Sequence, residues 1–155
     1  MSEQTESDIQ HKLFTLEQAN AMLPLVRAIV QDLSVLSQDV IDRRERLAGL
    51  KAKRAKPRDD LYQQEVQQIE QELQQDTLRL REFVEELQDL GVEPKNGPEG
   101  IVDFRCLLDG RVVYLCWKLG ENRITHWHEL EAGFAGRQTL PVEFLSGNTA
   151  LSSES

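Results

Sequence analysis

The feature that most constrains the fold is a repeating spacing of apolar residues in the middle of the chain. Between positions 66 and 90 they recur in alternating steps of three and four, interrupted once by Asp76. They are Val66, Ile69, Leu73, Leu80, Phe83, Leu87 and Leu90. This heptad-like spacing predicts a long helix with one face packed against another helix. We expect Asp59 or Asp60 to cap this helix and Gly91 to end it.

An earlier helix is predicted from about position 15. Thr15 and Gln18 have the spacing of a capping box, in which each side chain accepts a hydrogen bond from the other residue's backbone amide. The helical pattern stops at Lys56-Pro57, because a residue before proline disfavours helical backbone angles. Pro24 has no amide donor, so we expect a kink there or a junction between two helices. Two long helices joined by a short turn predict an antiparallel hairpin.

Beyond residue 92 the apolar period falls to two, which predicts strands. Runs 101–108 and 111–119 flank Asp109-Gly110, a dipeptide typical of two-residue hairpin turns. A third strand is expected over residues 123–129. The second half of the chain should therefore form a small three-stranded antiparallel sheet.

The turn at Asp109-Gly110 also fixes which residues lie opposite each other. It places Cys106 opposite Val113, and Asp103 opposite Cys116. The two cysteines then lie on opposite faces of the sheet and should not form a disulfide bond with each other.

The elements together predict an α+β protein, with a long, coiled-coil-like helical hairpin followed by the sheet. The expected boundaries are 1–12 for a disordered N-terminus, 13–145 for a single domain (13–91 hairpin, 92–145 sheet) and 146–155 for a disordered tail. A two-helix hairpin buries only one stripe per helix and is marginal alone, so we expect a homodimer through the hairpin. Packing of the hairpin on itself alone, or on another protein, is the alternative.

Charge is distributed unevenly along the chain. Overall there are 27 acidic and 18 basic residues, a net charge of −9, which argues against nucleic-acid binding by the whole surface. The stretch 43–58, however, holds eight basic residues and one acidic residue. Its Lys51, Lys53, Arg54 and Lys56 form a basic tip of the hairpin that could contact RNA phosphates. The alternative is structural: these cations complement helix ends and pair with the acidic second helix.

Some classes of protein are excluded by the sequence. No apolar run approaches the ~18 residues of a membrane-spanning helix. The first ten residues show neither the basic nor the apolar region of a secretory signal. We therefore expect a cytoplasmic protein that makes no membrane contact.

The segment 126–129, His-Trp-His-Glu, is the most informative stretch for chemistry. Alternate residues of a strand point to one face, so two imidazoles there could bind one metal ion. The candidate ligands are His126, His128, Glu129, Cys116 and Asp103. Such a set of donors suits a divalent ion such as zinc, iron or manganese. The alternative is that both histidines are structural, hydrogen-bonded and stacked near a tryptophan.

A candidate anion-binding site is the glycine-rich loop that ends at Arg137. Its backbone amides and the guanidinium could bind an anion. A plain connecting loop is the alternative, because the loop lacks the lysine and hydroxyl residue that end a phosphate-binding loop.

Four stretches together resemble a known family. They are Phe14–Pro24, Gly100–Phe104, Val113–Gly120 and His126–Arg137. They are similar to the bacterial and archaeal family called domain of unknown function 2203, over about residues 13–140. The resemblance implies that the stretches belong to one module, and it implies no activity.

The leading functional hypothesis is a metal or small-ligand site on the sheet. If the site is catalytic, the ion would polarise a substrate or lower the pKa of bound water. The rival hypothesis is a non-enzymatic adaptor that self-associates or binds a partner through the hairpin. RNA or ribosome contact through the basic tip is a third hypothesis.

Overall fold

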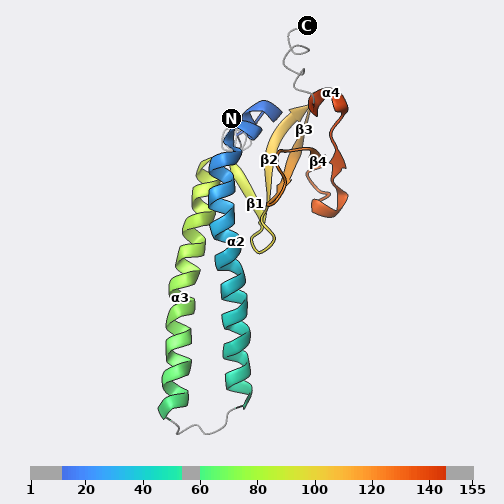
Figure 1. The fold of residues 1–155 in the computed structure, drawn as a ribbon. Helices are drawn as coiled ribbons and strands as arrows, with labels where there is room; N and C mark the ends of the chain where they lie inside the picture. Colours follow the sequence, from blue (N-terminus) through green and yellow to red (C-terminus); the bar gives the residue numbers. More distant parts are fainter. Residues whose placement is uncertain (1–11, 54–59, 146–155) are drawn as a thin grey trace, which may run out of the picture.

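The computed structural model describes residues 12–53 and 60–145. Two long helices, α2 (Leu16–Lys53) and α3 (Asp60–Asp89), form a hairpin, and a five-stranded antiparallel sheet follows (Figure 1). Its strands are β1 (Val92–Asn96), β2 (Ile101–Leu108), β3 (Arg111–Lys118), β4 (His126–His128) and β5 (Gln138–Thr139). The predicted α+β fold with a helical hairpin is confirmed. The disorder expected at the two ends, the turn at Pro57 and the cap at Asp59 lie outside the described residues.

The start of α2 follows the predicted capping box. The amide of Gln18 donates to Thr15 Oγ1, and the amide of Thr15 donates to Gln18 Oε1, both at 3.0 Å. Phe14, just before the cap, is buried edge-on against Phe104 of β2, with ring centroids 5.2 Å apart. The backbone amide of Phe14 also donates to the carbonyl of Arg105. These contacts attach the beginning of the hairpin to the sheet.

Pro24 does not divide the first helix. α2 runs without interruption from Leu16 to Lys53, so the expected junction between two helices is wrong. Figure 1 shows the first turns of α2 set at an angle to the rest, as the missing amide of an internal proline allows.

The sheet has five strands where the sequence predicted three. β1 contains Pro94, which removes a donor and disguises the strand, and a sheet edge is where proline is tolerated. β5 has only two residues, too few for a periodic signal. β4 is three residues long, shorter than the strand expected over 123–129. The segment after β4 also forms two short helices, η1 (Phe134–Gly136) and α4 (Val142–Leu145).

The predicted register between β2 and β3 is confirmed. Asp103 pairs with Cys116 and Cys106 pairs with Val113, as the two-residue turn requires. Both cysteines are free. The inner face of the sheet joins both helices in one core, whose largest fully buried side chains are those of Trp117, Phe104, Leu87 and Leu115. The outer face holds the residues across from this core, including Asp103 and Cys116.

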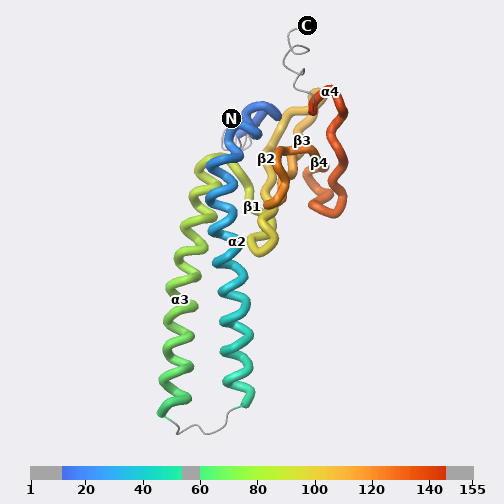
Figure 2. The backbone as a smooth tube through the Cα atoms, in the orientation of Figure 1, coloured from blue at the N-terminus to red at the C-terminus, as the bar shows by residue number. Residues whose placement is uncertain are grey.

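The hairpin projects away from the sheet. Figure 2 shows the sheet beside the upper part of the hairpin, while the lower halves of both helices extend beyond it. Because little covers these lower halves, α3 buries only Ile69 and Leu87 among its described residues. By length and composition α2 also qualifies as a candidate membrane span, a test that core helices of soluble proteins pass as well.

Candidate metal centre

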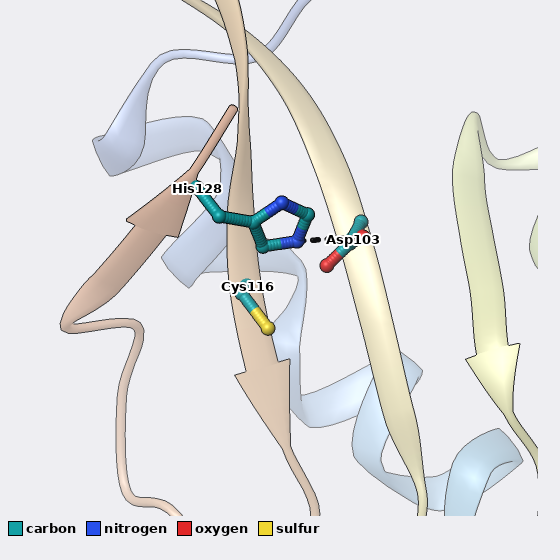
Figure 3. A group of neighbouring side chains, drawn as sticks. All are labelled: Asp103, Cys116 and His128. Atoms are coloured by element: carbon teal, nitrogen blue, oxygen red, sulfur yellow. Dashed lines mark hydrogen bonds and ion pairs between the residues drawn. The ribbon is translucent and has the colours of Figure 1, made fainter. Parts of the chain in front are cut away.

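Three neighbouring strands bring three chemically distinct side chains together on the outer face. Asp103 comes from β2, Cys116 from β3 and His128 from β4 (Figure 3). One ligand atom from each lies within 4.8 Å of the other two. All three are buried, with exposed fractions of 1%, 0% and 1%. This is the one cluster of at least three such residues, among those the structure describes, compact enough to surround an ion.

The imidazole of His128 is held in a defined orientation. Its Nδ1 lies 2.7 Å from the carbonyl oxygen of Glu129, which can only accept, so Nδ1 carries the hydrogen. In the neutral ring Nε2 then presents a lone pair, and it lies 3.0 Å from Asp103 Oδ2. A lone pair and a carboxylate oxygen repel each other unless a cation lies between them, either a proton or a metal ion. A backbone carbonyl on the far nitrogen is also how metal-binding histidines are commonly oriented.

The other two members of the cluster are strongly affected by burial. Burial raises the pKa of Asp103, and the neighbouring His128 only partly offsets this effect. Burial, and then the Asp103 carboxyl beside it, raises the pKa of the Cys116 thiol to about 12. Asp103 Oδ1 has no hydrogen-bond partner among the described residues. An unsatisfied buried oxygen is costly, and a bound cation would satisfy it.

The cluster opens onto a pocket of about 280 Å³ on the outer face. Asp103 and His128 form part of its wall. The other lining residues are Lys95, Asn96, Ile101, Tyr114, Leu130, Gly133 and Phe134. The pocket therefore combines a buried polar end, the ammonium of Lys95 and the side-chain amide of Asn96 from β1, and apolar side chains from the segment after β4.

A polar network supports the pocket beside the cluster. Tyr114 donates to Glu93 Oε1 at 2.7 Å, and Arg105 donates to Glu93 Oε2 at 2.8 Å. Burial alone would raise the pKa of Glu93, but hydrogen bonds from Tyr114, Arg105 and Lys95 hold it below its usual value. The Tyr114 ring packs on the His128 ring, with centroids 5.3 Å apart. The network thus fixes one side of the histidine.

Sequence reasoning missed Glu93, Lys95 and Tyr114 as site residues. The first two lie on β1, the strand that Pro94 disguised. The alternation of Glu93 and Lys95 around Pro94 was the available signal, since alternate strand residues share a face. Tyr114 was placed on the correct face by the register, but nothing in the sequence indicated its neighbours.

Two of the predicted ligands lie outside the cluster. His126 Nδ1 is 2.8 Å from the hydroxyl of Thr125, and the ring is half-buried. The carboxylate of Glu129 accepts from Arg111 Nη1 at 2.5 and 2.6 Å. Only the backbone carbonyl of Glu129 reaches the site, where it orients His128.

The predicted anion-binding residue, Arg137, is already paired. Its guanidinium donates to Glu121 at 2.6 and 3.3 Å and stacks over the Phe134 ring, 4.3 Å from the centroid. Because Phe134 lines the pocket, this contact supports the pocket wall. The structure thus favours a connecting role for this loop.

The described part of the basic tip contacts the acidic second helix. Lys51 pairs with Glu70 at 3.2 Å. Nearby, Arg46 pairs with Glu65 at 2.7 Å. Arg43 pairs with Asp76, the polar residue that interrupts the apolar spacing of α3. Lys53 is exposed in the last turn, while Arg54 and Lys56 lie outside the described residues. These ion pairs favour the structural interpretation of the basic stretch over RNA contact.

Fold and site together define a small α+β protein with a helical hairpin and a pocket over a buried histidine, aspartate and cysteine. The chain belongs to the family described as uncharacterized conserved protein (DUF2203), whose sequence model matches residues 12–140. The match covers most of the chain and confirms the resemblance. No curated protein and no solved structure matches the chain.

Proposed function

We propose that the protein binds one divalent transition-metal ion of the zinc class through Asp103, Cys116 and His128. The observation that carries this proposal is the compact buried cluster: Nε2 of His128 and Oδ2 of Asp103 lie 3.0 Å apart, and the Cys116 thiol lies beside them. Nitrogen, sulfur and oxygen donors together suit zinc and similar ions better than calcium or magnesium. This site replaces the predicted pair of histidines, since His126 lies outside the cluster.

Three protein ligands leave a fourth position of a tetrahedral ion open, which is typical of catalytic rather than structural zinc sites. Here that position would face the pocket, because Asp103 and His128 line it. A bound ion would polarise a ligand in the pocket or lower the pKa of a bound water. Asp103, Cys116 and His128 would hold the ion, and Tyr114 would keep the imidazole in place.

The experiment is reconstitution of metal-free protein with Co²⁺, a coloured substitute for zinc. Wild type should bind about one equivalent and show a thiolate-to-cobalt charge-transfer band, as expected for a three-residue site with one cysteine. Cys116→Ala should lose the band, whereas Cys106→Ala, on the opposite face, should keep it. Elemental analysis of untagged protein as purified would identify the native ion.

The two histidines provide a second matched pair of variants. His128→Asn should weaken Co²⁺ binding by about 10- to 100-fold or more, the range typical of disturbing a metal site. His126→Asn should leave the affinity unchanged. A wild-type protein without the charge-transfer band, or equal losses in both histidine variants, would contradict the proposal.

Self-association through the hairpin is a second candidate function. The two hairpin helices carry exposed apolar side chains, including Val35 of α2 at 60% and Leu78 of α3 at 53% exposure. Pairing of two hairpins would cover them and form a four-helix arrangement. Light scattering should then give twice the chain mass of 17.8 kDa. Leu78→Glu should give monomers. Leu107→Glu, at an equally exposed position on the sheet, should remain dimeric. A monomeric wild type at high concentration would exclude this function.

A further inference from the structure

The residues around the pocket leave a net positive charge when an ion binds. In the metal-free protein, Lys95 and Arg105 both pair with Glu93, and Asp103 pairs with His128. The other charged groups nearby pair among themselves, Lys118 with Glu99 and Arg137 with Glu121. In the occupied site, Lys95, Arg105 and a divalent ion would supply four positive charges, and Glu93, Asp103 and the Cys116 thiolate would supply three negative charges. The occupied site therefore carries one uncompensated positive charge.

An uncompensated charge in a partly enclosed pocket is costly unless a counter-charge accompanies it. A monoanion in the pocket would supply that counter-charge and occupy the open coordination position. Lys95 is placed to bind the same anion. Its ammonium lies 4.7 Å from the centroid of the Tyr114 ring, which itself packs on His128. It contacts Glu93 at 3.2 Å, and since an ammonium has three hydrogens it retains donors for a ligand.

The remaining walls indicate what the anion carries. Ile101, Leu130 and Phe134 contribute apolar side chains to the lining of the pocket. The volume of about 280 Å³ lies at the lower end of the ~300–1,000 Å³ typical of small-molecule sites. A small molecule with one charged end and an apolar body fits this lining.

We propose that the pocket binds a small monoanionic carboxylate, its charged end between the metal ion and Lys95 and its apolar body against Leu130 and Phe134. This inference rests on the proposed metal site and adds the class of ligand. It assigns Lys95 a binding role and Leu130 a role in selecting an apolar ligand.

The test uses Co²⁺-loaded protein titrated with benzoate, followed by the visible cobalt spectrum. Benzoate should change the spectrum and bind about tenfold more tightly than acetate, because the ring buries apolar surface. Neutral benzamide should leave the spectrum unchanged. Lys95→Met should weaken benzoate binding by about tenfold, the loss expected for a charge-assisted contact, while the Co²⁺ stoichiometry stays constant. Lys51→Met, at the far end of the hairpin, is the control and should bind benzoate as wild type does.

A second variant tests the contribution of the apolar lining separately from the charge of Lys95. Leu130→Ser, at a position that is 41% exposed, should reduce the preference for benzoate over acetate. A normal cobalt spectrum that does not respond to benzoate, or that responds equally in Lys95→Met, would overturn the ligand assignment and leave the metal site standing. Tighter binding of inorganic phosphate than of benzoate would also overturn it. Absence of the cobalt spectrum itself would refute the metal site and this inference with it.

Discussion

At the scale of single residues, the site depends on side chains that burial makes unusual. Within the described residues Asp103 Oδ1 has no hydrogen-bond partner, and burial with the neighbouring Asp103 raises the pKa of the Cys116 thiol to about 12, so the metal-free cluster is poorly satisfied. Arg137, by contrast, has complete ionic and stacking contacts. The residues that a ligand would stabilise can thus be distinguished from those that stabilise the fold.

The thiols give the first prediction at this scale. Burial raises the pKa of Cys106 to about 11, and that of Cys116 to about 12 with a further contribution from Asp103. Since the thiolate is the reactive form, neither cysteine in folded, metal-free protein should react readily with a thiol reagent such as DTNB at pH 8. Both should react at once in guanidinium chloride. Single Cys→Ala variants assign each signal, and rapid labelling of either native thiol would be inconsistent with the burial described.

The ion pair of Glu121 with Arg137 gives the second prediction. Burial tends to raise the pKa of Glu121, but the hydrogen bonds and charge of Arg137, with the Lys118 amide, lower it below 4.5. A carboxylate whose pKa is lower in the folded state contributes stability that is present above its unfolded pKa and is lost as the pH falls through the folded value. Glu121→Gln should therefore reduce the free energy of unfolding by about 1 kcal/mol at pH 7, a part-buried pair being worth slightly more than an exposed one.

The check is urea unfolding of wild type and Glu121→Gln from pH 7 to pH 3. The difference between their unfolding free energies should shrink below about pH 4, near the ordinary pKa of glutamate. A difference that is constant over this range would mean that packing, and not the charge of Glu121, accounts for the effect.

At the scale of elements, the parts predicted from the sequence are those controlled by local rules. The capping box at Thr15, the end of α3 before Gly91 and the whole β2–β3 register follow from contacts within a few residues. The edge strands were missed because Pro94 hides one and the other is two residues long. Local rules contain no signal for a strand defined mainly by its partner.

The candidate site shows the same limit. Register places His126, not His128, directly opposite Cys116, so pairing alone would select the wrong histidine. The observed cluster is diagonal: His128 reaches across β3 to Asp103 on β2. Such contacts depend on sheet twist and side-chain length, which spacing in a sequence does not encode.

Two glycines provide an element-scale prediction with opposite signs. Gly110, in the β2–β3 turn, has φ +79°, and Asp109 before it has φ +54°. An added Cβ would meet no atom within 4 Å at Gly110 or at Gly49 in α2, so only backbone preference differs. Gly110→Ala should destabilise the protein by about 1 kcal/mol because alanine disfavours positive φ. Gly49→Ala should stabilise it by about 0.5–1 kcal/mol, as alanine is the better helix former. Urea unfolding measures both changes in the free energy of unfolding. Two changes of the same sign would contradict either the positive φ at Gly110 or the helical position of Gly49.

At the scale of the whole molecule, hairpin and sheet share one core. Leu23 and Val26 of α2, Leu87 of α3, and Phe104 and Trp117 of the sheet belong to a single buried cluster. The lower halves of the two helices, as far as they are described, extend beyond the sheet (Figure 2). Because helices in a marginal hairpin depend on packing, the hairpin should unfold together with the sheet.

The proposed metal site makes this coupling measurable. An ion that bridges β2, β3 and β4 binds the folded state alone, and at 100 times its Kd it should add about 2.7 kcal/mol to the unfolding free energy. For a chain of this length that corresponds to a rise of about 5–10 °C in Tm. Far-ultraviolet circular dichroism reports mainly the hairpin helices, and near-ultraviolet signals report Trp117 and Trp127 in the sheet. With zinc, both transitions should move upwards together, and His128→Asn should move neither. If the tryptophan signal alone shifts while the helices melt at an unchanged temperature, hairpin and sheet are separate cooperative units, and the shared core is too weak to transmit the stability gained at the metal site to the hairpin.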